Sequence, residues 1–86
     1  MQSFRSCGLS LNTRAVYCIN LQGMLDPSWA DELGGMQIHH TDQEDQPPVT
    51  TLTGELPDQA ALAGVLNLVY TLGMPLISVV CLQPVD

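Results

Sequence analysis

The sequence predicts a single small α+β domain made of four short strands and two helices. Alternating polar and apolar residues indicate strands in several short segments, and an apolar stripe at helical spacing lies in the C-terminal half. The chain has 86 residues, of which 45% are hydrophobic, and this is enough for one small core. We therefore expect the order strand, helix, two strands, helix, strand.

The first half of the chain supplies the first three of these elements. Residues 16–21 alternate as a strand does, and residues 36–41 alternate again and form the second strand. Between them, Asp26 and Pro27 suit the start of a short helix over residues 28–33, and two glycines follow it. Trp29 and Leu33 are four residues apart and would lie on the buried face of this helix.

The second half of the chain holds the longest helix. Residues 49–56 form the third strand, Asp58 caps the helix that follows, and Gly73 ends it. The helix has a broad apolar arc, formed by Ala61, Leu62, Val65, Leu68, Val69 and Leu72. Residues 76–82 form the fourth strand, and because they are apolar and β-branched we expect this strand to be buried on much of both faces.

Short, right-handed connections place these elements in a ferredoxin-like βαββαβ arrangement, a four-stranded antiparallel sheet with two helices on one face. The face beneath the helices would carry Tyr17, Ile19, Leu21, Met36, Ile38, Leu52 and Gly54. The open face would carry Cys18, Asn20, Gln37, His39, Thr41, Thr51, Thr53 and Glu55. Gly54 and Gly64 are interpreted as sites of close packing.

The charge balance and the cysteines exclude several classes of protein. Nine acidic residues against two arginines, Arg5 and Arg14, give a net charge of −7. Nucleic acids and anionic membranes are bound by clusters of Lys and Arg, so neither is expected as a partner. Three cysteines without CxxC spacing argue against a disulfide framework and a zinc site, and they fit a cytoplasmic protein. We expect a disordered tail over residues 1–14 and one domain over 15–86.

A membrane-spanning helix is the main alternative for the C-terminal third. Residues 59–85 contain no charged side chain, which is typical of a membrane span. Asn67, Thr71 and the Gly73–Met74–Pro75 break interrupt the stretch, and no Lys or Arg flanks it. A helix, a turn and a strand explain the same residues, and this is the interpretation that we favour.

Two groups of residues could carry chemistry. His39 and His40 lie near Asp42, Glu44 and Asp45, but neighbouring residues on a strand point to opposite faces, so the two imidazoles would not share a metal ion. Cys18 and His39 could form a nucleophile pair on the open face. In a ferredoxin-like sheet the first two strands are not neighbours, which argues against this pair. We therefore expect no catalytic residue, no metal and no cofactor.

From about Tyr17 to Val80 the sequence resembles an uncharacterised family of short bacterial proteins. The resemblance lies in the motifs GxLDxxW (23–29), TLTG (51–54), DQAALxGVL (58–66), LG (72–73) and PLxSV (75–79). It implies no activity, cofactor or catalytic residue. Members of that family look like they place basic residues in the second half of the helix, where this chain has Leu68 and Tyr70.

The favoured hypothesis is a non-enzymatic cytoplasmic module that self-associates or binds a protein partner. It rests on the uncharged fourth strand, whose edge invites pairing, and on an apolar flank of the helix. The residues expected at the interface are Leu66, Tyr70, Val80 and Leu82. The alternative is a small-molecule-sensing regulatory domain of the ACT type, with a pocket at a dimer interface or beside Gly23 and Gly54. An enzyme that uses Cys18 and His39 is a third hypothesis.

Overall fold

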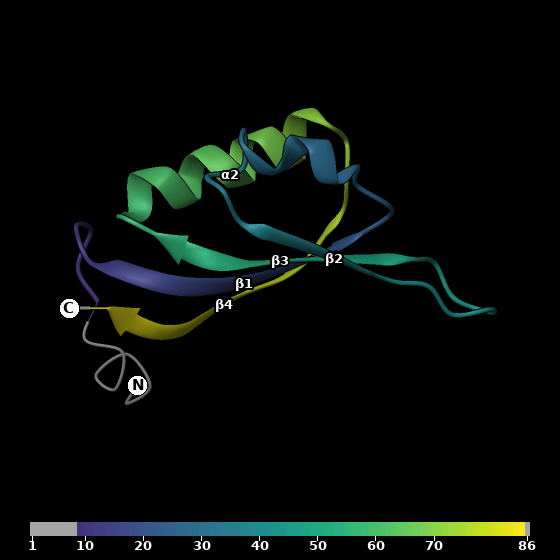
Figure 1. The fold of residues 1–86 in the computed structure, drawn as a ribbon, viewed down its shortest axis with the longest axis horizontal. Coiled ribbons are helices and arrows are strands. Elements are labelled where there is room, and N and C mark those ends of the chain that lie inside the picture. The colour runs from purple at the N-terminus through teal and green to yellow at the C-terminus, as the bar shows by residue number, and fades with distance from the viewer. Residues whose placement is uncertain (1–8, 86) are drawn as a thin grey trace.

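A four-stranded antiparallel sheet and one α-helix form the structure, a computed structural model that describes residues 9–85. The elements are β1 (Arg14–Gln22), the 3-10 helix η1 (Pro27–Ala30), β2 (Gln37–Thr41), β3 (Val49–Leu56), α2 (Gln59–Thr71) and β4 (Leu76–Val85). The strand order is β2-β3-β1-β4, and each neighbouring pair is antiparallel. Figure 1 shows α2 lying along one face of this sheet. The predicted α+β class and its four strands are therefore confirmed.

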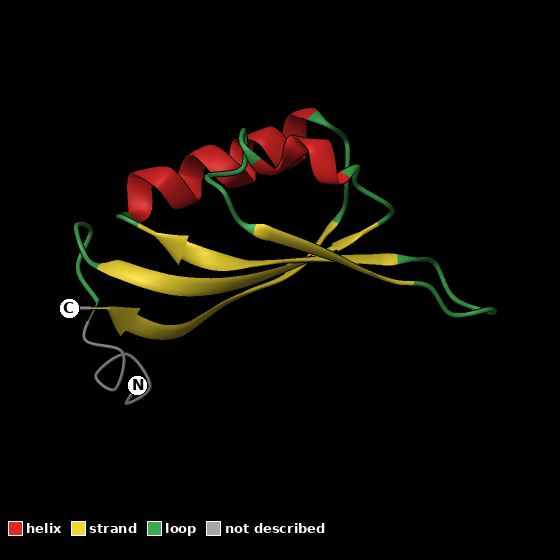
Figure 2. Cartoon of the chain, viewed as in Figure 1, coloured by secondary structure: helices red, strands yellow, loops and turns green. Residues whose placement is uncertain are grey.

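The first predicted helix is wrong as an α-helix, because η1 is a single 3-10 turn. The Trp29 N–H donates to the carbonyl of Asp26, three residues back, at 3.0 Å. Gly34 and Gly35 then take φ values of +73° and +76°, which end any helix. A segment this short cannot offset the cost of nucleating an α-helix. Figure 2 shows η1 on the same side of the sheet as α2. The ferredoxin-like arrangement with two helices is not confirmed.

The core lies between the sheet and α2, on the predicted face. Tyr17, Ile19 and Leu21 of β1 are at most 3% exposed, and Val65 and Val69 of α2 pack in the same cluster. The remaining buried apolar side chains in this cluster are Ala15, Leu25, Leu33, Met36, Leu52 and Leu56. Ile38 and Trp29 are partly buried against it.

The two glycines interpreted as packing sites have different surroundings. A Cβ at Gly54 would lie 3.1 Å from the Cα of Met36, so the close packing predicted there is confirmed. A Cβ at Gly64 would meet no atom within 4 Å, and this residue is exposed, so that prediction is wrong. Gly64 lies on the exposed side of α2, and no neighbouring element in residues 9–85 packs against it there.

Helix α2 begins and ends where the sequence predicted. The Asp58 side chain accepts a hydrogen bond from the Ala61 N–H at 2.9 Å, and Gly73 takes a φ of +76° after the last turn. The apolar arc faces the sheet, with Val65 and Val69 buried. The helix is 13 residues long, and no helix in residues 9–85 is long and apolar enough to cross a membrane.

The start of the described chain is tied to the start of α2. Thr13 N–H donates to the carbonyl of Ser10 at 3.2 Å, and Gln59 N–H donates to the carbonyl of Leu11 at 3.0 Å. Of the disordered tail predicted over residues 1–14, residues 1–8 lie outside the described residues, residues 9–13 form this turn, and Arg14 is the first residue of β1.

The loop after β1 is fixed by hydrogen bonds to β2 and β3. The buried Thr50 hydroxyl accepts from the Leu25 N–H at 3.1 Å and donates to the Gly23 carbonyl at 2.6 Å. The Nε2 atom of His40 lies 2.6 Å from the carbonyl oxygen of Leu25. One hydroxyl thus satisfies two backbone groups, and Thr50 of β3 thereby holds the loop after β1 in place.

Candidate interaction surface

Strand β4 is a long apolar strand at one edge of the sheet. It has ten residues, LISVVCLQPV, and none of them is charged. Eight large apolar side chains are exposed among residues 9–85, and five of these belong to β4. They are Leu76, Ile77, Val79, Val80 and Leu82, with exposed fractions from 36% at Val79 to 55% at Leu82. Exposed apolar residues that gather on one element indicate an interaction site.

The prediction that the fourth strand is buried on much of both faces is therefore wrong. Helix α2 packs on β3, and its buried residues Val65 and Val69 join the side chains of the central strands. The segment before β2 forms only the turn η1 and not a second helix, and η1 contacts β2, at the other edge. The core side of β4 is thus left half open, where Leu76 is 50% exposed.

The backbone of β1 shows which groups of β4 point away from the sheet. The Gln22 N–H donates to Pro75, just before β4, and the Gly23 N–H donates to Pro48, just before β3. Strand β1 pairs with β3 without a register shift, so its residues alternate between the two neighbours, and the even-numbered residues bond to β4. Cys18 lies opposite Val80 and Ile19 opposite Val79. Val80 therefore bonds to β1, and the N–H and C=O of Val79 point outward.

Two bulges divide β4. The register with β1 shifts between Val16 and Tyr17 and between Asn20 and Leu21, so Leu82 and Ile77 are extra residues in β4. Between the bulges, residues 78–81 form a regular segment. Pro84 lies opposite Ala15, an odd-numbered residue, so its missing N–H is on the outward side, where a proline is tolerated.

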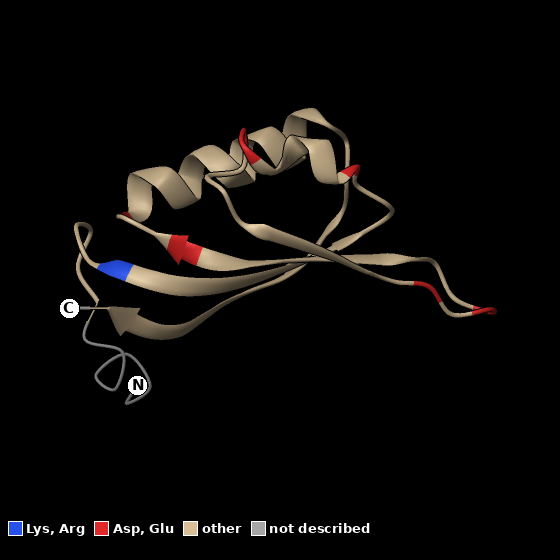
Figure 3. Ribbon diagram, in the orientation of Figure 1, with Lys and Arg blue, Asp and Glu red and all other residues tan. Residues whose placement is uncertain are grey.

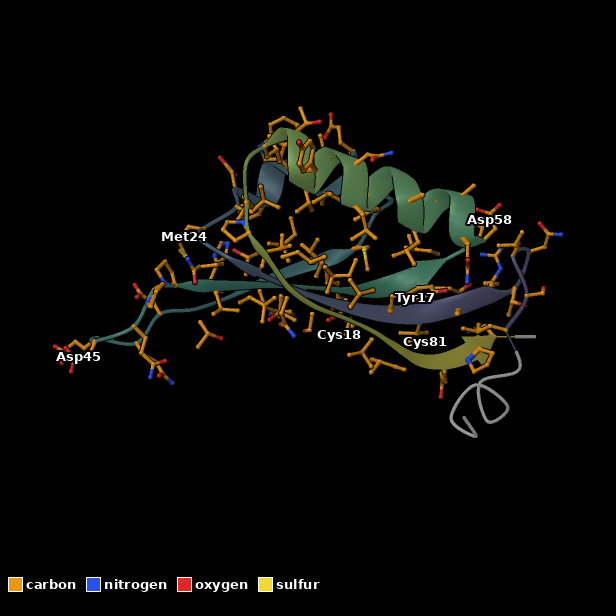
Figure 4. The ribbon with its side chains drawn as sticks, turned by 180° about the vertical axis from the view of Figure 1, so that it is seen from behind. Tyr17, Cys18, Met24, Asp45, Asp58 and Cys81 are labelled. Atoms are coloured by element: carbon orange, nitrogen blue, oxygen red, sulfur yellow. The ribbon has the colours of Figure 1, made fainter. Side chains whose placement is uncertain are left out.

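The open face of the sheet carries a row of polar side chains across all four strands. Asn20 donates from Nδ2 to the Ser78 hydroxyl at 3.0 Å and accepts at Oδ1 from the Thr51 hydroxyl at 2.7 Å. His39 lies opposite Thr51 on β2. Two residues further along the strands, Cys18 of β1 lies opposite Thr53 of β3. Figure 4 shows Tyr17 on the helix side of β1 and Cys18 on the other side. The predicted open-face residues thus share one face.

The four residues predicted at the interface lie on two different surfaces. Tyr70, on α2, is 84% exposed, whereas Leu66 is partly buried against the core. Val80 shares the open face with Cys18, on the side of the sheet opposite to the helix. Leu82 lies in a bulge of β4 and is exposed. Sequence reasoning missed Leu76, Ile77 and Val79, because it took the apolar, β-branched composition of this strand as a sign of burial.

The candidate chemical groups are separated in the structure. Cys18 is on β1 and His39 on β2, with β3 between them, so their backbones are about 10 Å apart across the sheet. The strand between the two residues argues against a Cys–His nucleophile pair. In the described part of the chain, no three His, Cys, Asp or Glu side chains are grouped so as to hold a metal ion. His40 instead contacts the carbonyl of Leu25.

Methionine side chains lie close to Gly23 and Gly54, the two glycines beside which a pocket was expected. A Cβ at Gly23 would lie 3.2 Å from the terminal methyl of Met74, and Met36 packs on Gly54. A hollow of about 490 Å³ lies elsewhere, between η1 and β2, where Pro27, Ala30, Met36 and Ile38 contribute to its lining. It is shallow and holds no charged side chain, so it provides few groups that could fix the orientation of a small molecule.

The acidic side chains of residues 9–85 lie away from β4. Figure 3 shows the acidic residues on the β2–β3 loop, around η1, at the end of β3 and at the start of α2. Asp45 at the tip of that loop and Asp58 at the start of α2 lie at opposite ends of the molecule (Figure 4). Arg14 pairs with Glu55 at 3.0 Å, and because both side chains are about half exposed this ion pair adds little stability.

These features define a small α+β domain with a half-covered sheet and one open apolar edge. A family model described as a domain of unknown function (DUF8691) matches residues 16–80, which is most of the chain. The chain belongs to this family. No curated protein and no solved structure matches this chain.

Proposed function

We propose that the chain is a non-enzymatic protein-interaction module that accepts a strand from another protein chain at the β4 edge. The observation that carries this proposal is the composition of β4, an uncharged ten-residue edge strand with exposed apolar side chains. An added strand would bond to the outward groups of β4, such as those of Val79, and would bury these side chains. Strand addition of this kind is a common mode of protein recognition.

The rest of the surface supports β4 as the binding edge. Sheet edges in soluble proteins usually carry charges, because charges prevent pairing with other chains. The chain has nine acidic residues, yet β4 holds none of them within residues 76–85. The proposal gives Cys18 and His39 no catalytic role, since β3 separates them.

The variant Val79→Pro tests this proposal. Proline at position 79 removes an outward N–H and leaves the bonds between β4 and β1 intact, and Pro84 already occupies such a position. Tyr70→Ser is the matched control, because Tyr70 is exposed on α2, away from β4. The measurements are light scattering of the purified chain and quantitative co-purification from native extract.

We expect the wild type and Tyr70→Ser to associate with another chain, which is either a second copy or a different protein. We expect Val79→Pro to lose this association. Association that Val79→Pro leaves unchanged would overturn the proposal. Association lost with Tyr70→Ser and kept with Val79→Pro would move the binding surface to α2.

A further inference from the structure

We infer that the strand added to β4 is the β4 strand of a second copy of this chain, antiparallel and with Val80 opposite Val80. This inference rests on the proposed function and names the partner for that edge. It follows from the charge of β4, from the symmetry of an antiparallel strand pair and from the direction of the backbone groups between the two bulges.

The side chains of β4 suit a second β4. Each copy carries a net charge of −7, so two copies repel one another wherever their acidic residues meet. Strand β4 is uncharged, and pairing two of these strands places no like charges opposite each other. Each copy brings exposed valine, leucine and isoleucine side chains to the same line of contact. Apolar side chains on one strand are thus buried by the same apolar side chains on the other.

Symmetry restricts the register. Two identical strands that pair antiparallel in one continuous sheet are related by a twofold axis perpendicular to that sheet. Residues opposite each other must point to the same face, so their numbers differ by an even number. In an antiparallel pair the sum of the two opposite residue numbers is constant, and an even difference makes this sum even. One residue therefore lies opposite its own copy, and the axis passes between the two. In the regular segment of β4, the two inner residues that can occupy the axis are Val79 and Val80.

The backbone groups favour Val80. With Val80 on the axis, Val79 of each copy lies opposite Cys81 of the other. In both residues the backbone N–H and C=O point outward, away from β1. The strand pair then has two hydrogen-bonded residue pairs, one on each side of the axis. With Val79 on the axis, the corresponding outer pair would join Cys81 to Ile77, which lies in a bulge and breaks the ladder.

The assembly would be one eight-stranded antiparallel sheet. A twofold axis perpendicular to the sheet keeps both α2 helices on the same face. The two open faces then form one surface, and the polar rows that run through Asn20 and Ser78 lie on both sides of the axis. Val80 and its copy meet on this open face, where Val80 is 46% exposed in the single chain.

Disulfide trapping tests the register. The background carries Cys7→Ser, Cys18→Ser and Cys81→Ala, and Val80→Cys and Val79→Cys are made separately in it. In an antiparallel pair that is not hydrogen-bonded, the Cα atoms of opposite residues are about 4.5 Å apart, which a disulfide can span. In the Val80-centred register, Val79 and its copy are diagonal neighbours about 7–8 Å apart, beyond the reach of a disulfide. Thermal melts show that each variant is folded.

We expect rapid formation of a covalent dimer by Val80→Cys under mild oxidation and at least a tenfold slower reaction of Val79→Cys. The wild-type chain gives a second readout, because a mixture of labelled and unlabelled protein would show a close Hα–Hα contact between Val80 and its copy by NMR. The reverse order of cross-linking would overturn the register. If the chain forms dimers but neither cysteine variant cross-links and the NMR contact is absent, β4–β4 pairing is overturned.

Sedimentation of the wild type separates this inference from the proposed function. A chain that stays monomeric through the millimolar range would overturn the second copy as the partner. The proposed function would still stand in that case if a different protein co-purified with the wild type and was lost with Val79→Pro.

Discussion

The two edge strands of the sheet differ in length, composition and surroundings. Strand β2 has five residues, mostly polar and exposed, and it leads into a loop that carries Asp42, Glu44 and Asp45. Strand β4 has ten residues and no charge. A short polar edge beside acidic groups resists pairing, whereas a long apolar edge favours it. The comparison shows that one sheet can protect one edge and leave the other available.

The largest expected effect distinguishes the two sides of β4 itself. Val80→Pro removes a hydrogen bond to β1, and the proline ring conflicts with a paired strand, so we expect this variant not to fold. Val79→Pro removes an outward N–H, and we expect it to fold with a loss of about 1 kcal/mol in the free energy of unfolding. Circular dichroism and thermal melts of the pair measure this difference. Equal stability of the two variants would contradict the backbone directions assigned to β4.

The next effect concerns the β2 side of the sheet. Thr50→Val leaves the Leu25 N–H and the Gly23 carbonyl without the hydroxyl that satisfies both. We expect a loss of about 1–3 kcal/mol in the free energy of unfolding, measured by urea denaturation. Self-association at temperatures where the variant is folded should be unchanged, because β1 lies between Thr50 and β4 and the outward groups of β4 are on the other side of that strand. A loss of association at those temperatures would show that β4 does not act alone.

Lysine substitutions compare the two edges directly. Val80→Lys places a charge on the exposed side of β4, and Gln37→Lys places the same charge on the exposed side of β2. Both should change the free energy of unfolding by about 0.5 kcal/mol or less. We expect Val80→Lys to weaken dimerisation at least tenfold, or about 1.4 kcal/mol, and Gln37→Lys to leave it unchanged. Sedimentation equilibrium of both variants measures this, and similar effects at the two edges would contradict the account.

The smallest effect is that of salt. Two copies with a net charge of −7 repel each other, and added salt screens this repulsion without weakening apolar contacts. We expect dimerisation to strengthen severalfold between low and moderate ionic strength. A dimer that dissociates as salt is added would indicate an interface held by ion pairs, which β4 cannot supply.

The elements that the sequence predicted correctly are those with strong local patterns. Alternation gave the third strand with its observed bounds, Val49–Leu56, and Asp58 and Gly73 marked the ends of α2. The core face of β1 followed from the same alternation, as the burial of Tyr17 and Ile19 shows. Such patterns depend on residues close together in the chain, and a single sequence contains this information.

The parts that could not be predicted depend on tertiary packing. Asp26 and Pro27 begin a helical turn, but nothing in the local pattern showed that it would end after Ala30. The burial predicted for β4 was inferred from its apolar, β-branched residues, and it was wrong because an apolar strand is buried only if another element covers it. The sequence contains the motif TLTG, yet the role of its neighbour Thr50 depends on a loop far away in the chain. The uncharged edge of the fourth strand was evident from the sequence, whereas the exposure of Leu76 on its core side depends on how much of the sheet the helix covers.

Amide hydrogen exchange at Val79 and Val80 tests the central claim most directly. In dilute solution, we expect the Val80 N–H to be protected by its bond to β1 and the Val79 N–H to exchange rapidly. At concentrations where the chain associates, the Val79 N–H should become protected as well, while α2 keeps its exchange pattern. A Val79 N–H that stays unprotected in the assembled state would show that the β4 edge does not receive a strand, and the account would be wrong.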